Sequence, residues 1–159
     1  MRLFSIEKKA LIQKIKRTAP GTDSTGGYEE VSHTADLALR VWGENMNALF
    51  AHAAYGITRL MSDAVSKGTP TITRFLSIEA MDAESLLVEW LSELAFLAES
   101  EGAVFQSFSI THITGTDLKA VLEGQLSGEL RRTIKAVTYH NLEIVRTVRG
   151  LEATVVFDV

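Results

Sequence analysis

The stretch Ser32-His33-Thr34-Ala35-Asp36 leads directly into the apolar segment Leu37-Ala38-Leu39-Arg40-Val41-Trp42, and the rest of the chain is organised around it. The apolar segment is typical of a strand. A sheet holds the polar residues at the ends of its strands in fixed positions, and catalytic and binding residues are often found there. A carboxylate such as Asp36 can cap a turn, pair with a base or bind a cation, depending on what the fold brings beside it.

Length and composition narrow the class of protein. The chain has 159 residues, of which 46% are hydrophobic and 23% charged, as expected of one ordinary soluble domain with a single core. No apolar run approaches the roughly 20 residues needed to cross a bilayer, so we expect no membrane partner. The chain has no cysteine, which excludes disulfides, thiolate nucleophiles and zinc-thiolate sites. We expect a cytoplasmic protein, since that compartment is reducing.

The net charge of −4 hides an uneven distribution. Residues 1–17 hold six of the 16 basic side chains and one of the 20 acidic ones, a net charge of +5. The other 142 residues therefore hold 10 basic and 19 acidic side chains, a net charge of −9. Phosphate binding depends mainly on Lys and Arg, so strong direct binding of nucleic acid is not expected. A body this acidic is better suited to a cation or a basic protein surface.

The chain is predicted to divide near Tyr28. Residues 1–27 comprise a basic segment, which could form a short amphipathic helix, and a linker rich in Gly, Ser and Thr. We expect this part to be poorly ordered. An extension without an essential role is favoured over a membrane or RNA anchor. Residues 28–159 are predicted to form the folded domain.

Two helices are predicted from apolar spacing and capping residues. The first begins at Asn45 or Asn47 and runs to about Met61. The second begins after Asp82 and ends at Gly102.

The remaining segments indicate strands. They lie at 71–80, 103–113, 117–126, 134–140, 142–148 and 151–159, in addition to the strand that begins at Leu37. The order of elements predicts an α+β fold. It is expected to be a two-layer domain, with two amphipathic helices packed on a mixed, largely antiparallel β-sheet.

Five segments, in a fixed order over nearly the whole predicted domain, closely resemble those of the archease family. They are His33-Thr34-Ala35-Asp36, Leu87-Val88-Glu89-Trp90-Leu91, Glu101-Gly102-Ala103-Val104-Phe105, Ile134-Lys135-Ala136-Val137-Thr138-Tyr139-His140 and Phe157-Asp158-Val159. One departure is the loop 128–133, where archease-like chains usually carry an acidic or proline-containing stretch ending in histidine. This departure leaves the contribution of that loop to partner contact open.

The resemblance implies an accessory protein rather than an enzyme. Archease-like proteins activate RtcB-type RNA ligases, which join tRNA halves in tRNA splicing. They promote guanylylation of the ligase's active-site histidine and so restore multiple turnover. The expected partner is therefore an RtcB-type RNA ligase.

The resemblance also implies a cation site made by Asp36, Asp158 and the terminal carboxylate of Val159. Carboxylate oxygens are hard ligands, and three anions brought together require a cation to offset their repulsion. Ca²⁺ is the expected ion, with Mg²⁺ or Mn²⁺ as alternatives. The meeting of Asp36 and Asp158 rests on the family, because 121 residues stand between them.

Three further residues are candidates for supporting roles around this site or for contact with the partner. His33 is expected to orient a carboxylate or donate to the backbone, and it would be a ligand if the metal were Zn²⁺ or Mn²⁺. Lys135 could contact the ligase or its nucleotide, or form an ordinary ion pair. Lys135 and His140 lie five residues apart, so on one strand they would face opposite sides.

Two alternatives of other classes remain. The chain could be a general chaperone, or a specificity modulator of RNA-modifying enzymes such as a tRNA methyltransferase. It could also be a free-standing metal-dependent hydrolase that activates water at the carboxylates. The hydrolase is the weakest hypothesis, since the sequence shows no plausible pair of a nucleophile and a general base.

Overall fold

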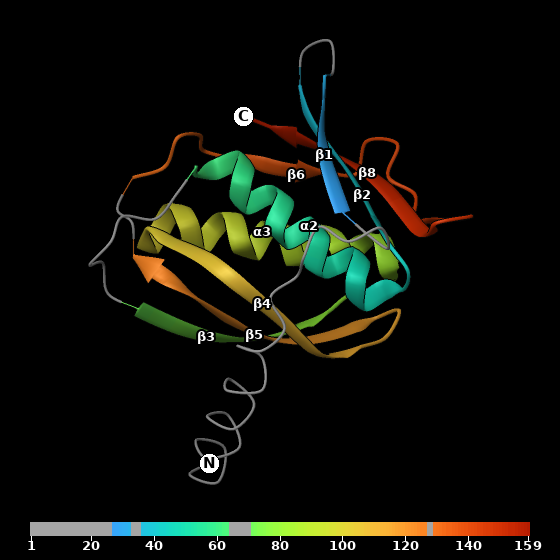
Figure 1. Ribbon diagram of the computed structural model, residues 1–159, viewed down its shortest axis with the longest axis horizontal. Coiled ribbons are helices and arrows are strands. Elements are labelled where there is room, and N and C mark those ends of the chain that lie inside the picture. The colour runs from blue at the N-terminus through green and yellow to red at the C-terminus, as the bar shows by residue number, and fades with distance from the viewer. Residues whose placement is uncertain (1–26, 33–35, 64–70, 127–128) are drawn as a thin grey trace, which may run out of the picture.

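The computed structural model describes residues 27–32, 36–63, 71–126 and 129–159. The predictions for residues 1–26 and for His33 lie outside this part of the chain. Within it, the two helices form a middle layer between two antiparallel sheets (Figure 1). The predicted α+β fold with helices packed on antiparallel strands is confirmed. The predicted single sheet is in fact two, one on each side of the helices.

The first sheet, called sheet A, contains both ends of the described chain. Its strands are β1 (Gly27–Ser32), β2 (Leu37–Gly43), β8 (Gly150–Asp158) and β6 (Ala136–Thr138), in the spatial order β1-β2-β8-β6. The short strand β7 (Val145–Thr147) pairs with the other half of β8. All these pairings are antiparallel.

The second sheet, called sheet B, has three strands in the order β3-β5-β4. They are β3 (Thr71–Glu79), β5 (Asp117–Leu126) and β4 (Ala103–Ile113), again antiparallel. Strands β4 and β5 have the predicted bounds.

Both helices begin and end at residues suited to those positions. Helix α2 (Met46–Met61) starts at Asn45, whose side chain accepts a 2.9 Å hydrogen bond from the Ala48 N–H. Helix α3 (Ala83–Glu101) ends at Gly102, whose φ of 66° lies in the left-handed region that glycine tolerates best. The predicted caps Asn45, Asp82 and Gly102 are therefore confirmed.

The core lies in the middle layer, where apolar faces of both sheets meet the helices. Trp90 of α3 is fully buried, and its indole N–H donates to the Phe50 carbonyl of α2 at 2.9 Å. The ring of Phe108, from β4, lies edge-on to Trp90 with the centroids 6.3 Å apart. One residue thus links α3, α2 and sheet B and fixes the middle layer relative to the sheet below it.

The loop that departs from the family pattern closes the end of α2. The backbone N–H groups of Arg131 and Arg132 donate to the Met61 carbonyl at 2.8 and 3.3 Å. The Arg131 guanidinium also donates to the Arg59 carbonyl at 3.1 Å and pairs with Asp63 at 2.7 Å. The last carbonyls of a helix lack partners within the helix, so these contacts have a structural role at that end.

Four predicted strands need correction, and one strand was not predicted. The strand expected at 134–140 is limited to Ala136–Thr138, and the one expected at 142–148 is limited to Val145–Thr147. β3 ends at Glu79, one residue short of the predicted 80, and the strand expected at 151–159 spans Gly150–Asp158. β1, which pairs with β2 along its whole length, was not predicted because its Gly-Tyr-Glu-Glu sequence has no clear apolar alternation.

Asp82 is expected to make the stability of the protein depend on pH. Its carboxylate accepts from the Ser85 N–H at 2.7 Å, and the hydrogen bonds from Ser85 lower the pKa of Asp82 below its ordinary value of 3.8. A lowered pKa means that the contribution is present above pH 3.8 and is lost as the pH falls through the folded value. Asp82→Asn keeps an acceptor but does not titrate. Melting curves of both proteins from pH 7 to pH 2 should therefore converge below about pH 4.

A matched control comes from the other helix. Asn45→Asp introduces a titrating cap on α2 and is expected to add the same kind of acid sensitivity. Parallel curves for wild type and Asp82→Asn over the whole pH range would contradict the prediction.

Candidate functional site

The pairing of β2 with β8 brings Asp36 and Asp158 to the same end of sheet A. Leu37 pairs with Phe157, Asp36 directly precedes Leu37, and Asp158 directly follows Phe157. Cα atoms of paired residues in antiparallel strands lie about 4.5–5.5 Å apart. The backbones of the two aspartates therefore lie next to each other, although 121 residues stand between them in the sequence.

The side-chain alternation of the strands sets the direction of Asp158. Leu37 and Phe157 point into the core, so Asp158, one residue on, belongs to the outer face of sheet A. Both aspartates are exposed, and so is Val159, which is 44% exposed. These carboxylates are accessible to an ion or a partner.

Strand β6 brings Lys135 to the same end. Ala136 pairs with Asp158, and the Lys135 backbone N–H donates to the Asp158 carbonyl at 2.8 Å. The Lys135 side chain is exposed. The backbone bond holds the end of β8 in the sheet.

The donor chemistry at this end fits a hard cation. Two aspartate side chains offer oxygen ligands only, the kind of ligand that Ca²⁺, Mg²⁺ and Mn²⁺ prefer. In the part of the chain that the structure describes, no group of three or more His, Asp or Glu side chains gathers around one point. A cation here would depend on the Val159 carboxylate, on backbone oxygens and on water to complete its coordination.

Of the two predicted histidines, the structure describes only His140. His33 lies outside the described residues. His140 lies in the turn after β6, where its backbone N–H is 3.3 Å from the Thr138 hydroxyl and its ring is 3.3 Å from the Asn141 amide. The expectation that Lys135 and His140 face opposite sides of one strand was wrong in its premise, because β6 contains neither residue.

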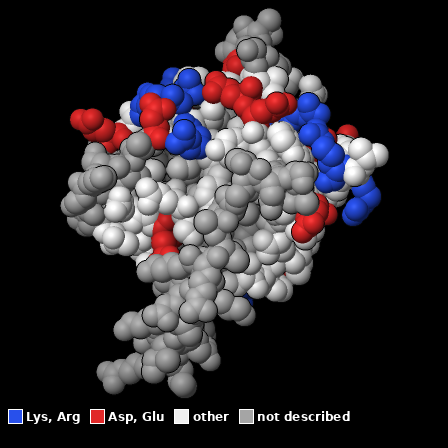
Figure 2. Space-filling view, in the orientation of Figure 1, with Lys and Arg blue, Asp and Glu red and all other residues white. Residues whose placement is uncertain are grey.

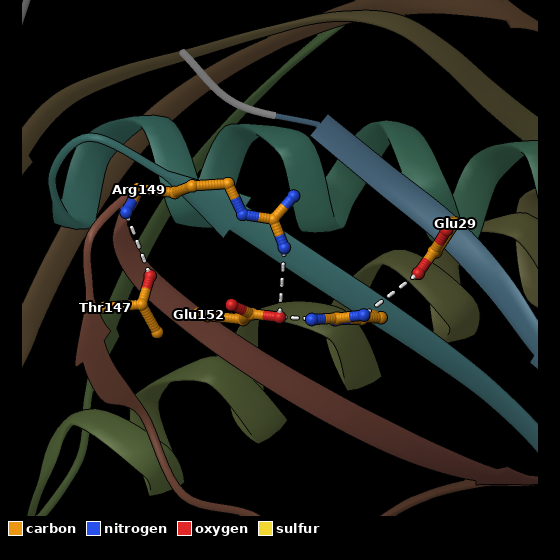
Figure 3. Close-up of polar contacts among 5 residues, drawn as sticks. Glu29, Thr147, Arg149 and Glu152 are labelled. Carbon is orange, nitrogen blue, oxygen red and sulfur yellow. Dashed lines mark hydrogen bonds and ion pairs between the residues drawn. The ribbon is translucent and has the colours of Figure 1, made fainter. Parts of the chain in front are cut away.

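A network of charged side chains that the sequence did not reveal lies on the outer face of sheet A (Figure 3). Glu152 of β8 accepts from Arg40 of β2 and lies 3.4 Å from Arg149. Arg40 also lies 3.4 Å from Glu29 of β1, and the Arg149 guanidinium stacks 4.6 Å from the centre of the Trp42 ring. The hydrogen bond and charge of Glu152 raise the pKa of Arg40, so the network stays charged.

Two of the surface cavities formed by the described residues lie beside sheet A and α2. The larger, of about 500 Å³, is an open depression on sheet A next to this network. The smaller, of about 200 Å³, lies beside α2 and is lined by Tyr28, Tyr55 and Phe105, among others. Burial raises the pKa of Tyr55.

Charged side chains are unevenly distributed over the surface. In the view of Figure 2, most of the visible charged side chains lie in the upper half, on the side of sheet A.

Residues 28–159 match the model of the Archease protein family (MTH1598/TM1083). Curated archease proteins resemble the chain over most of their length. That of Methanosarcina barkeri is 34% identical over 140 residues, which cover 83% of this chain and 95% of the relative. That of Sulfurisphaera tokodaii is 34% identical over 125 residues, covering 74% and 87%. In the described residues, no helix is both long enough and apolar enough to span a membrane.

Solved structures agree with this assignment. The solution structure of Methanobacterium thermoautotrophicum protein 1598 has a TM-score of 0.62 and 27% identity, and the match covers 84% of this chain and 99% of that one. A crystal structure from Thermotoga maritima, described as an archease and possible chaperone, has a TM-score of 0.56 and 24% identity and supports the fold alone. The match of the family model over residues 28–159, together with these relatives, shows that the chain belongs to the archease family.

Proposed function

We propose that this protein is a cytoplasmic activator of an RtcB-type RNA ligase of the tRNA-splicing kind. In this proposal it promotes guanylylation of the ligase histidine and restores multiple turnover, and it is not itself a catalyst. The proposal extends the archease membership of the chain to a partner and an activity. The acidic domain supports it, because a protein with few basic groups is better suited to bind a ligase than to bind RNA.

The convergence of Asp36 and Asp158 at one end of the β2–β8 ladder is the observation that carries the proposal. Two like charges side by side repel each other unless a cation or a partner offsets them. Both residues are exposed, so a protein that docks on this end of sheet A can reach them. We expect Ca²⁺, or alternatively Mg²⁺ or Mn²⁺, to bind between them and the Val159 carboxylate.

The site would act on the ligase by alignment. A bound cation would give a rigid positive centre that orients phosphate oxygens or metal ligands of the partner. Correct positioning of reacting groups alone can lower a barrier by about 7–11 kcal/mol in favourable cases. Lys135, whose backbone N–H donates to the Asp158 carbonyl, has an exposed side chain that would be available to a phosphate or a carboxylate of the partner.

Transfer of labelled guanylate to the purified ligase tests the proposal. The rate and extent of labelling, and the number of ligation turnovers per ligase molecule, should rise when the full-length protein is added. An inactive ligase variant that lacks its nucleotide-accepting histidine is the control for unspecific labelling. A ligase that gives the same labelling and turnover with and without the protein would refute the proposed function.

A general chaperone is the second candidate, and the description of the Thermotoga maritima relative as a possible chaperone favours it. In that case the protein should protect several unrelated clients, including a tRNA methyltransferase, from heat aggregation. The protection should persist in Asp36→Asn and Asp158→Asn. Protection of a single ligase that requires both carboxylates would instead support the activator.

A further inference from the structure

We propose that the open depression on the outer face of sheet A receives a lysine or arginine side chain of the partner ligase, and that this contact docks the ligase beside the carboxylate pair. The inference rests on the proposed function and adds to it the surface that the partner covers. The depression has a volume of about 500 Å³, and its walls include Glu29, Val31, Arg40, Glu143, Val145 and Glu152.

The depression and the carboxylate pair share one face of the sheet. Thr154, which also lines the depression, and Asp158 lie four residues apart on β8, and residues separated by an even number point to the same face of a strand. Arg40 and Asp36 have the same separation along β2 and the chain that leads into it. Four residues span about 13 Å in a strand. A globular partner that reaches the aspartates therefore also covers the depression.

The charge of the depression identifies the chemistry of the occupant. Three glutamates and one arginine line it, and when Arg149, which pairs with Glu152, is counted with them the local net charge is −1. Arg40 is already engaged, because it pairs with both Glu152 and Glu29. Glu152 is held from a second direction by Arg149, whose guanidinium stacks on Trp42. These contacts fix one wall and leave the depression negative, which favours a cationic side chain.

Glu143 is the group best placed to bind that cation. It is exposed on the opposite wall, in the segment between β6 and β7, and in the described part of the chain it joins none of the ion pairs. Its neighbour Ile144 is anchored, since the Ile144 N–H donates to the Glu84 carboxylate of α3 at 3.1 Å. Val31 and Val145 provide apolar contact for the hydrocarbon stem of a lysine or arginine.

The test is a titration of the ligase with full-length wild-type protein, Glu143→Lys and Glu99→Lys. Glu99 is also an exposed glutamate, but it lies on α3 and does not line the depression, so Glu99→Lys is the matched control. We expect Glu143→Lys to raise the dissociation constant for the ligase about tenfold or more, because it sets like charges against each other. Stimulation at saturating concentration should stay at the wild-type level, since the aspartates are unchanged. Glu99→Lys should bind as wild type does, and Glu143→Gln should lie between wild type and Glu143→Lys.

The outcomes separate this inference from the proposed function. If wild type stimulates the ligase and Glu143→Lys binds it with the wild-type affinity, the docking surface is wrong and the function stands. If the wild type neither binds nor stimulates the ligase, both are overturned.

Discussion

Asp158→Asn is expected to abolish stimulation of the ligase while leaving the fold intact. The substitution keeps the size of an exposed side chain at the end of β8 and removes one of the charges proposed to hold the cation. Substitution of residues that only support the ligands of a metal typically lowers the affinity for the metal 10–100-fold. Loss of the charge of a ligand should therefore weaken cation binding by at least about tenfold. Cation affinity by calorimetry and ligation turnovers should fall together.

Asp36→Asn is expected to have the same effect, because Asp36 leaves the adjacent strand at the same end of the ladder. Glu99→Gln serves as the control for loss of one exposed carboxylate elsewhere. Extending the chain by one glycine beyond Val159 tests the terminal carboxylate separately, since it moves that group without altering a side chain. Full stimulation by both aspartate variants, with unchanged melting temperatures, would exclude the site.

Gly124→Ala is expected to be the most destabilising of the single substitutions considered. A Cβ atom at Gly124 would lie 2.1 Å from the Val104 carbonyl oxygen and 2.5 Å from the Phe105 Cα. Both are backbone atoms of the paired strand β4, so neither can rotate away. Forcing atoms into a packed interior typically costs 1–3 kcal/mol, and this contact should cost about 3 kcal/mol or more. The melting temperature should fall by roughly 6–12 °C for a domain of this size.

Gly115→Ala is the matched control. Gly115 lies in the turn between β4 and β5, and a Cβ atom there would meet nothing within 4 Å. Its effect on the free energy of unfolding should stay within about 0.5 kcal/mol. Equal melting temperatures for Gly124→Ala and wild type would show that β4 and β5 are not as closely packed as the structure has them.

The features predicted correctly from the sequence are those set by local interactions. The side chains of Asn45 and Asp82 each cap a helix by accepting from an N–H three residues later, and Gly102 ends a helix by its own backbone freedom. The β4–β5 hairpin is joined by a short turn, in which the Thr114 hydroxyl accepts from the N–H groups of Thr116 and Asp117. Such features need no knowledge of distant parts of the chain.

The features missed depend on pairing between distant segments. Whether the strands form one sheet or two is decided by which strand pairs with which, and alternation does not carry that information. The Arg40–Glu152 pair joins residues 112 positions apart, so alternation could place Arg40 on a face but could not supply its partner. β6 is shorter than predicted because only three residues of the predicted strand 134–140 pair with β8.

The candidate site also combines features that the local sequence indicates with features that depend on the pairing of distant segments. The residue types at Asp36 and Asp158 indicate a cation, but their proximity follows only from the register of β2 against β8. The family resemblance predicted that they would meet, and the register brings them to the same strand end. The depression on sheet A had no signal in the sequence, since its walls come from β1, β2, β8, β7 and the segment before β7.

The position of a bound manganese ion tests the central claim most directly. Crystals of the full-length protein grown with Mn²⁺ should show one strong anomalous peak at the end of sheet A. Carboxylate oxygens of Asp36, Asp158 and Val159 should lie within coordination distance, about 2.0–2.6 Å, of that peak. A structure in which the ion binds elsewhere, or in which these oxygens point apart and hold none, would contradict the account.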